Sequence, residues 1–248
     1  MGTYCPTDGY ADPQGVIQGF WDRCKELGVE IHFQHAVTEI QRQGDRIVSV
    51  TANGTTFEAE HFSVCAGAWC GEIGKLAGAE IPVFPVRRML FITKPIDPSP
   101  ETFPAVIPMS IDMDSGFYMR RESGGLLLGM EDDSEPPGFN ETLNWEWLYV
   151  MLEKGLHRFP ALEKCEIMRG WAGLYDQSPD HSAVLGRVPT LKNFYVVSGF
   201  SGHGFMQGPI ASRLVAELIA KGKPSIDIAP LRIERFAEGQ PVHEANVI

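Results

Sequence analysis

A glycine-rich segment, "GFSGHGFMQG" at residues 199–208, stands between a strand-like run, "NFYVVS", and a helical run, "PIASRLVAELIAKG". A strand that passes through glycines into a helix lets the backbone approach a ligand, and it leaves the amides of the first helical turn free to bind an anion or a polar ring edge. The spacing differs from the dinucleotide fingerprint Gly-x-Gly-x-x-Gly, because Gln207 occupies the third glycine position. Taken alone, the segment is equally typical of a tight strand-to-helix connection.

The overall composition limits the classes of protein to which the chain can belong. With 248 residues, of which 44% are hydrophobic, it can bury one large core or two modest ones. Its formal net charge of −11 disfavours a nucleic-acid partner, which would need clustered Lys and Arg. No apolar stretch approaches the roughly 18 residues of a membrane span, and the opening residues lack the order of a secretory signal. We therefore expect a cytoplasmic protein with no nucleic-acid partner and no membrane span.

The candidate metal ligands do not form a metal-binding pattern. The five cysteines are odd in number and show no paired C-x-x-C spacing, which favours free thiols in a reducing compartment and disfavours zinc. The acidic segment "EDDSEPPG" offers the oxygens of Asp132, Asp133 and Glu135, but their spacing is not that of a cation-binding loop. We predict a solvated loop there and no bound metal.

The periodicity of apolar residues divides the chain into three zones. In the first, residues 13–28 predict a helix with Val16, Phe20, Cys24 and Leu27 on one face, and residues 29–69 alternate in the period of strands, with a hairpin at "ANG". The second zone, from about residue 82 to 170, predicts an antiparallel sheet with a helix in 142–159.

The third zone follows from residue 171. It predicts a loop containing Asp180 as a turn cap and His181 as a packing residue, a strand at 194–198, a helix at about 209–221 and a polar tail.

Three segments carry a resemblance to a known family. They are "SVCAGAWCGEIGKLAG" at 63–78, "GWAGLYDQSPDHSAVLG" at 170–186 and the glycine segment with its helix. In this order they resemble the D-amino-acid oxidase and sarcosine oxidase family of FAD-dependent oxidoreductases. The tail "IDIAPLRIERF" is similar to the branch that contains sarcosine oxidase beta subunits, proline dehydrogenase beta subunits and FAD-dependent oxidoreductase domain proteins.

The resemblance implies an α/β (α+β) architecture, the C-terminal part of a two-lobe FAD-binding fold. A partial FAD-binding lobe is expected from residues 1–80 and 171–248, with a mainly antiparallel substrate-binding sheet from 81–170. The strand–Gly-x-Gly-x-x-Gly–helix unit that grips the FAD pyrophosphate in the family is not found in this sequence. We therefore expect a fragment, or a subunit whose partner chain supplies that unit. The missing unit should leave apolar surface exposed, which homo-oligomers could cover. Whether the fragment binds FAD by itself stays open.

The resemblance also implies the residues that contact the cofactor. The helix that follows the glycine segment would favour the negative charge that develops on the flavin during reduction. Val37 matches a valine whose backbone meets the adenine, although a buried strand valine is an equal alternative, and Trp69 could equally be a core residue. The full set is Val37, Ala66, Gly67, Trp69, Gly173, Leu174, Gly199, Phe200, Gly202, His203, Gly204, Phe205 and Met206.

Differences from the family's residue pattern narrow the range of reactions that we expect this chain to catalyse. Tyr175 stands where amino-acid oxidases carry a carboxylate-binding arginine, and Gly173 stands where monomeric sarcosine oxidases carry the cysteine that attaches FAD. Met206 and Leu127 replace two lysines that the oxidases place beside the flavin. Because a cation there would stabilise developing superoxide, we expect a dehydrogenase that passes electrons to an acceptor other than oxygen.

The sequence indicates the residues that would contact the substrate less clearly than those that would contact the cofactor. Tyr118 and Arg120 lie two apart in a predicted strand and so point to one side of it, where they could hold a carboxylate. His203 could polarise or orient the flavin. The alternative is that Tyr118 and Arg120 are exposed strand residues, and that the pair Arg87 and Arg88, which has a similar family position, is solvated.

Two functions from different classes remain open at this point. The first is an FAD-dependent oxidoreductase acting on a secondary or tertiary amino acid such as sarcosine or proline. The second is a non-catalytic binding or assembly factor with the same fold.

Overall fold

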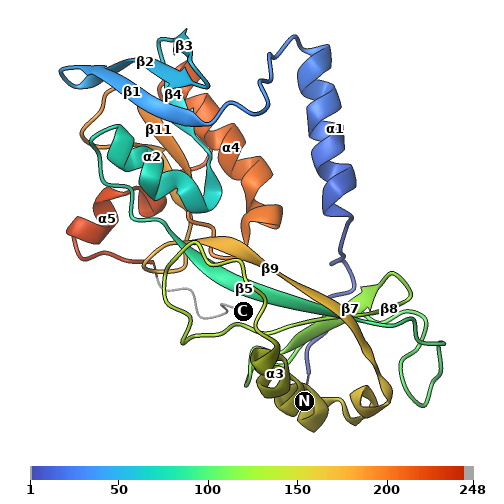
Figure 1. Cartoon of the computed structure of the whole chain (residues 1–248). Helices are drawn as coiled ribbons and strands as arrows, with labels where there is room; N and C mark the ends of the chain where they lie inside the picture. Colours follow the sequence, from blue (N-terminus) through green and yellow to red (C-terminus); the bar gives the residue numbers. More distant parts are fainter. Residues whose placement is uncertain (1, 243–248) are drawn as a thin grey trace.

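The computed structural model describes residues 2–242 (Figure 1). Its helices are α1 (Pro13–Glu26), α2 (Cys70–Leu76), α3 (Trp145–Arg158), α4 (Gly204–Lys221) and α5 (Glu234–Ala237), with the short 3-10 turns η1 (Gly67–Trp69), η2 (Pro160–Lys164) and η3 (Ala229–Leu231). Its strands are β1 (Val37–Gln43), β2 (Arg46–Ala52), β3 (Thr55–Glu58), β4 (Phe62–Val64), β5 (Phe84–Thr93), β6 (Ser110–Ile111), β7 (Tyr118–Glu122), β8 (Gly125–Gly129), β9 (Ile167–Gln177), β10 (Val184–Arg187) and β11 (Phe194–Ser198).

The upper half of the molecule in Figure 1 is an α/β lobe made from the two ends of the chain. It contains an antiparallel sheet in the order β1-β2-β3 and a second sheet in the order β10-β11-β4, in which β11 and β4 are parallel. The hairpin expected at "ANG" is the β2–β3 turn, where Asn53 and Gly54 take positive φ values of 46° and 76°. Buried aliphatic residues of both sheets and α2 form its core.

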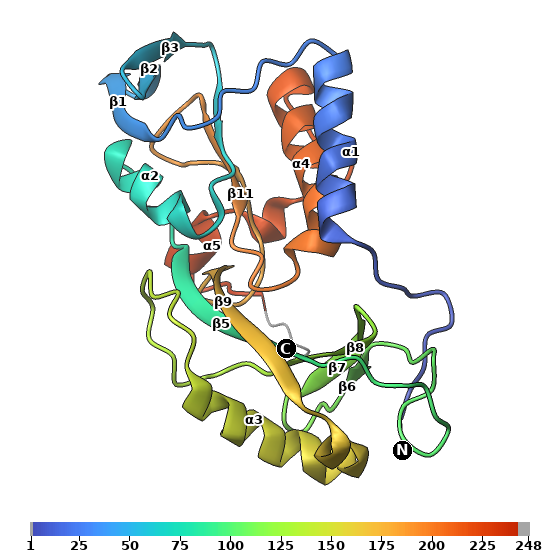
Figure 2. The same cartoon turned by 45° about the vertical axis from the view of Figure 1, so that its right-hand side comes forward.

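The lower half is built on an antiparallel five-stranded sheet in the order β6-β7-β8-β5-β9. α3 covers one face of this sheet, and the core between them includes Met89 and Phe91 of β5 and Met151 of α3 (Figure 2). Side chains alternate along a strand, so Arg88 and Leu90, on either side of Met89, point to the opposite face, which we call the open face. The pairing of β5 with β9 continues to Gln177, so the sheet extends past the lobe boundary expected at residue 170.

These observations confirm the expected fold class, a mixed α/β chain with an antiparallel sheet. The expected lobe boundaries themselves remain a proposal. None of the helices in the described part combines the length and apolar character that a membrane crossing demands.

Helix α1 forms where the sequence predicts it, because Asp12 caps its first turn by accepting hydrogen bonds from the amides of Gln14 and Gly15. It contains no buried residue, and its apolar side chains Ile17 and Phe20 are 60% and 57% exposed. Figures 1 and 2 show α1 at the rim of the upper lobe.

The strand expected from residue 29 is wrong for residues 29–36, which are an exposed connection. Pairing with β2 begins only at Val37, and Phe33 instead stacks its ring on Trp21 at 4.5 Å between centroids.

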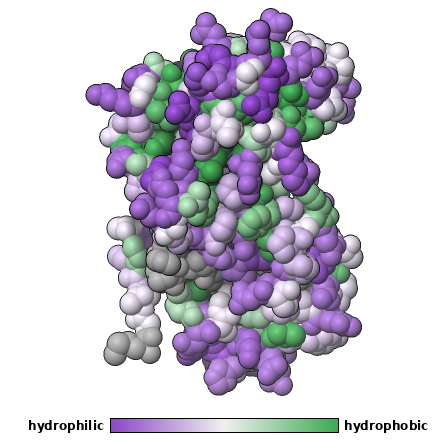
Figure 3. Space-filling view, turned by 90° about the vertical axis from the view of Figure 1, so that its left-hand side faces the viewer, coloured by the Kyte–Doolittle hydropathy of each residue, from purple (hydrophilic) through white to green (hydrophobic). Residues whose placement is uncertain are grey.

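In the space-filling view of Figure 3, hydrophobic patches interrupt the largely hydrophilic surface of the upper half.

Candidate active site at the glycine turn

The glycine turn, residues 199–203, connects β11 to α4 with a backbone that needs small residues. Gly199 and Gly202 take φ values of 74° and 97°, and Ser201 takes 49°. α4 begins at Gly204, five residues earlier than expected, and Pro209 lies inside it. The expectation placed Pro209 at the first helical position, where its missing N–H costs nothing. The amide of Gln207 already donates to the carbonyl of His203 at 3.1 Å, so the glycines themselves form the entry to the helix.

No side chain in the described residues caps the start of α4. The amides of its first turn therefore keep their capacity to bind an anion or a carbonyl edge. Phe205 and Met206, in this first turn, are 50% and 69% exposed. Phe200 differs from them, because it is 9% exposed and packs into the core between β11 and α4.

Three chain segments meet beneath the glycine turn. The Oδ2 atom of Asp176, near the end of β9, accepts hydrogen bonds from the Ser198 hydroxyl at 2.9 Å and from the Gly199 amide at 2.8 Å. The same hydroxyl lies 3.2 Å from the carbonyl oxygen of Gly67, which opens η1 with a φ of 52°. These contacts fix β9, η1 and the glycine turn relative to one another.

Cys70 is buried beside this junction, and its sulfur accepts a hydrogen bond from the Ala66 amide at 3.2 Å. Burial raises the pKa of the Cys70 thiol to about 11, in spite of a lowering contribution from Ser198. Cys70 is therefore a structural thiol. The five cysteines are free, and among the described residues no group of three His, Cys, Asp or Glu side chains could hold a metal ion.

The glycine turn also contacts the open face of the five-stranded sheet. A Cβ atom at Gly202 would lie 2.7 Å from Cε2 of Tyr175, so the tyrosine ring packs directly on the glycine backbone. Tyr118 of β7 covers Gly129 of β8 in the same way. Burial raises the pKa of Tyr118 and of Tyr175 above the ordinary value, and for Tyr118 the neighbouring Tyr175 phenol adds to the increase. Both phenols are thus protonated donors at neutral pH.

Arg87 and Arg88 are not solvated, contrary to the alternative considered from the sequence. The Arg87 guanidinium pairs with Glu135 at 2.6 Å, and Arg88 pairs with Glu131. All four side chains are at most 13% exposed. The prediction of a solvated acidic loop is therefore wrong for Glu135, because the loop folds back onto β5 to neutralise buried arginines.

Arg120 lies apart from Tyr118 in its contacts, although both residues belong to β7. Its guanidinium pairs with Glu122 at 2.6 Å and lies over the Tyr10 ring at 5.2 Å. A cavity of about 750 Å³ adjoins it, lined by residues 10–13, 95–98 and 120–124. The structure therefore brings Tyr118, but not the charged end of Arg120, to the junction with Tyr175.

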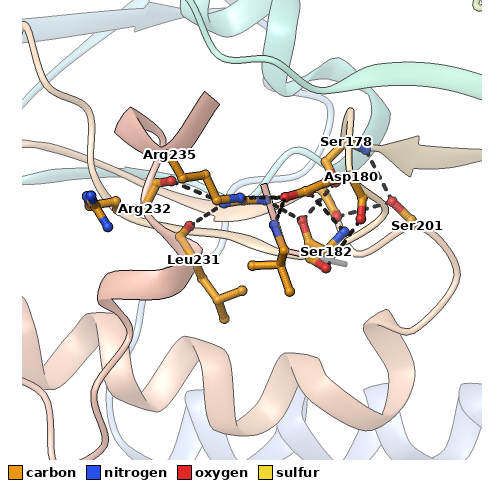
Figure 4. A network of polar contacts seen from close by, with 9 residues as sticks. Ser178, Asp180, Ser182, Ser201, Leu231, Arg232 and Arg235 are labelled. Carbon is orange, nitrogen blue, oxygen red and sulfur yellow. Dashed lines mark hydrogen bonds and ion pairs between the residues drawn. The ribbon is translucent and has the colours of Figure 1, made fainter. Parts of the chain in front are cut away.

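His203 caps no amide and lines a second cavity of about 280 Å³, together with His181, Gln207 and Phe200. The loop that carries His181 is held by the polar network of Figure 4. Asp180 does more than cap a turn, because its carboxylate pairs with Arg235 at 2.8 Å, and the Arg235 side chain is 0% exposed.

Within the segment expected as a polar tail, Arg235 of α5 is among the most deeply buried side chains. Its guanidinium also donates to the carbonyl oxygens of Leu231 and Ser182, at 2.7 and 2.8 Å. The network reaches the glycine turn through Ser201, whose hydroxyl accepts a hydrogen bond from the Ser178 amide at 3.1 Å (Figure 4).

The remaining residues assigned to cofactor binding do not all lie on the open face or at the glycine turn. Gly173 lies on the open face, and an added Cβ atom there would meet nothing within 4 Å. Leu174, next to it, points to the opposite face and lies across from Arg87. Trp69 is 51% exposed, with its ring 5.4 Å from that of Phe139. Val37 opens β1 in the separate β1-β2-β3 sheet.

Sequence reasoning missed Asp176 and Ser198, which hold the junction together. A signal existed for Asp176, which directly follows Tyr175 within the matched segment 170–186. Glu131 and Glu135 could not be connected to the arginines, because their partners lie more than 40 residues earlier in the chain.

Comparison with known proteins places these features in a family. Residues 1–218 match the family model described as DAO, FAD dependent oxidoreductase. The chain is 25% identical over 253 residues to mitochondrial dimethylglycine dehydrogenase of Mus musculus, covering 96% of the chain and 29% of that protein. It is 28% identical over 279 residues to FAD-dependent oxidoreductase domain-containing protein 1 of Bos taurus, covering 97% and 56%.

Among solved structures, L-proline dehydrogenase from P. horikoshii superposes with a TM-score of 0.87 at 31% identity, covering 96% of this chain and 63% of that one. The chain thus spans less than two thirds of the length of each of these relatives. Together with the matching fold and the glycine turn, the family match over most of the sequence shows that the chain belongs to the DAO family of FAD-dependent oxidoreductases.

Proposed function

We propose that this chain provides the substrate-binding part and the flavin-ring contacts of a dehydrogenase that oxidises a secondary or tertiary amino acid such as sarcosine or proline. The observation that carries the proposal is the packing of Tyr175 on Gly202, which brings the open face of the sheet against the glycine turn. The similarity to dimethylglycine, sarcosine and proline dehydrogenases supports this substrate class.

The residues at the junction fit a flavin ring. Gly173 leaves open space on the sheet, Gly202 brings backbone close to Tyr175, and the uncapped start of α4 presents amides. We assign ring contacts to the glycine turn, to residues 66–69 and to Gly173, and the adenine contact to Val37. When bound, FAD would accept a hydride from the carbon next to the substrate nitrogen.

The protein's own groups have separate tasks in this proposal. The amides at the start of α4 favour negative charge on a polar ring edge. The protonated phenols of Tyr118 and Tyr175 can donate hydrogen bonds to a bound substrate or ring. His203, the residue directly before α4, would polarise or orient the bound flavin.

Leu127 and Met206 support an electron acceptor other than oxygen, because neither side chain supplies the cation that the oxidases of the family carry at its position. Leu127 is 7% exposed within β8, and Met206 is uncharged. We propose that this electron transfer takes place in the cytoplasm, because the spacing of the cysteines favours a reducing compartment.

We further propose that the unit gripping the FAD pyrophosphate comes from polypeptide outside these 248 residues. β4 is an edge strand of the parallel pair, and α1 buries none of its residues. An open parallel edge and an uncovered apolar helix face are the surfaces that a further strand–helix unit would cover. A second copy of this chain is the alternative occupant.

The test uses protein isolated from its native source with any polypeptide that accompanies it. Its visible spectrum is recorded without oxygen before and after addition of sarcosine, dimethylglycine or proline. We expect flavin absorption that is bleached by at least one of these amino acids. A colourless preparation that takes up no FAD, or a flavin that none of them reduces, would refute the proposed function and favour a non-catalytic binding factor.

A further inference from the structure

Two consecutive arginines on β5 are both buried and both paired with an acidic residue, yet they point to opposite faces of the sheet. Arg87 points to the face covered by α3 and its flanking loop, where it also donates to the carbonyl oxygen of Thr142 at 2.5 Å. Arg88 points to the open face, since it pairs in register with Gly173 of β9. The two residues thus differ in surroundings while sharing residue type, strand and burial.

Arg88 lies at the junction with the glycine turn. Its guanidinium carbon is 5.3 Å from the centre of the Tyr175 ring, and Tyr175 packs on Gly202. Its Nη2 atom donates to Oε1 of Gln177 at 3.2 Å, and Gly173 beside it leaves open space. The Arg88 side chain is 10% exposed, and this burial lowers the pKa of its guanidinium from the ordinary value.

The hydrogen-bonding capacity of Arg88 is incompletely used. A guanidinium has five N–H donors, and the Nε atoms of Arg88 and of Arg87 are both buried without a hydrogen-bond partner among the described residues. Only that of Arg88 belongs to a side chain on the open face. Two further arginines lie on the open face by strand alternation. Arg120 pairs with Glu122, and the guanidinium of Arg169 lies over the Trp171 ring, 5.8 Å from its centre.

We propose that Arg88 is the residue that recognises the carboxylate of the substrate, and that Glu131 occupies its guanidinium when no substrate is bound. The proposal rests on the function proposed above and names the group that selects an amino acid over a simple amine. A carboxylate suits a guanidinium because two parallel N–H donors can meet its two oxygens. A substrate bound there would lie beside the open space above Gly173, where the flavin ring is assigned.

An incoming carboxylate must compete with Glu131 for the same guanidinium. Removal of the Glu131 charge should therefore strengthen ligand binding, whereas removal of the Arg88 charge should abolish it. A pair that only stabilised the fold would respond in the same direction to either change.

The experiment measures binding of L-proline and sarcosine to the native protein by calorimetry, with L-prolinamide as a probe that lacks the carboxylate. Arg88→Gln should weaken binding of the better amino acid about tenfold or more, as loss of a charge-assisted pair does. Glu131→Gln should strengthen it, and Arg88→Lys should restore part of the loss. Binding of L-prolinamide should not change with Arg88→Gln.

Arg87→Gln is the matched control, because it removes a neighbouring paired arginine from the opposite face. It should leave amino-acid binding unchanged. Thermal unfolding of each variant shows that it is folded, and the flavin spectrum shows whether cofactor binding persists. Four outcomes would overturn the proposal while leaving the flavin assignment standing. Arg88→Gln could bind the amino acids as tightly as the wild type, Glu131→Gln could bind them more weakly, or Arg87→Gln could lose as much affinity as Arg88→Gln. The fourth is a wild type that retains flavin but binds neither amino acid.

Discussion

The ring of Tyr175 occupies the space that a side chain at Gly202 would need, so the substrate sheet and the glycine turn are in direct contact. Gly202 is also held at a φ of 97°, which L side chains rarely adopt. Space and backbone conformation therefore demand glycine at the same position.

Gly202→Ala should lower the free energy of unfolding by about 1–3 kcal/mol, from backbone strain and displacement of the Tyr175 ring. Urea unfolding measures this change. Gly19→Ala is the control, because Gly19 lies in α1 with no atom within 4 Å of an added Cβ and no positive φ. It should stabilise the protein by about 0.5–1 kcal/mol. Equal stability of Gly202→Ala and the wild type would show that the ring contact is dispensable.

Gly173→Val should reduce the affinity for FAD without lowering stability. An added Cβ at Gly173 meets no atom within 4 Å, and valine is well suited to a strand. The valine side chain would nevertheless occupy the space assigned to the flavin ring. Fluorescence titration with FAD, compared with thermal unfolding, checks both halves of the prediction. Unchanged FAD affinity in a folded variant would remove Gly173 from the cofactor site.

The buried pair of Asp180 and Arg235 should dominate the stability of the C-terminal segment. Arg235→Ala should cost about 3–5 kcal/mol in unfolding experiments, because it leaves the Asp180 carboxylate buried and unpaired. Arg232→Ala, which removes the partly exposed pair with Glu238, should cost at most about 1 kcal/mol. Similar losses in the two variants would contradict this account of the network.

The same pair predicts a dependence of stability on pH. Burial raises the pKa of Asp180, but hydrogen bonds from Arg235, Val242 and Ser182 outweigh it and hold the pKa below the ordinary value. A carboxyl with a lowered pKa in the folded state contributes its full stability above the unfolded pKa of about 3.9 and loses it as the pH falls through the folded value. Asp180→Asn should therefore flatten the loss of stability below about pH 4, measured by urea unfolding at several pH values. An unchanged slope would argue against this linkage.

Cys70 should resist alkylation. Its pKa of about 11 leaves little thiolate at pH 8, and the side chain is 0% exposed. Cys5 and Cys65 are exposed and serve as internal controls in the same protein. Iodoacetamide labelling read by mass spectrometry should modify the two exposed thiols first. Labelling of Cys70 at a comparable rate in folded protein would show that the junction opens readily.

Local chemistry explains the parts of the fold that could be predicted from the sequence. Asn53 and Gly54 specify the hairpin turn by their tolerance of positive φ, and the apolar period of residues 145–158 predicts α3 because its buried side recurs at helical spacing. The position of the glycine turn between a strand-like run and a helical run predicts this connection, although Pro209 favours a later start for α4 than the start observed at Gly204.

The long-range pairs could not be predicted in this way. Asp180 and Arg235 are separated by 55 residues, and a single sequence contains no signal that joins them. Arg88 and Glu131 likewise meet only because the loop after β8 folds back onto β5. Solvation is the ordinary state of charged side chains, and tertiary pairing overrode it at these positions.

Hydrogen–deuterium exchange of the native protein with and without saturating FAD tests the central claim most directly. If the glycine turn and η1 contact the cofactor, the amides of residues 66–69 and 199–206 should exchange more slowly when FAD is present. Peptides from α3 and η2, on the far face of the sheet, should not change. Bound FAD that leaves residues 66–69 and 199–206 unprotected, or protects a different surface instead, would contradict the assignment of this junction as the flavin site.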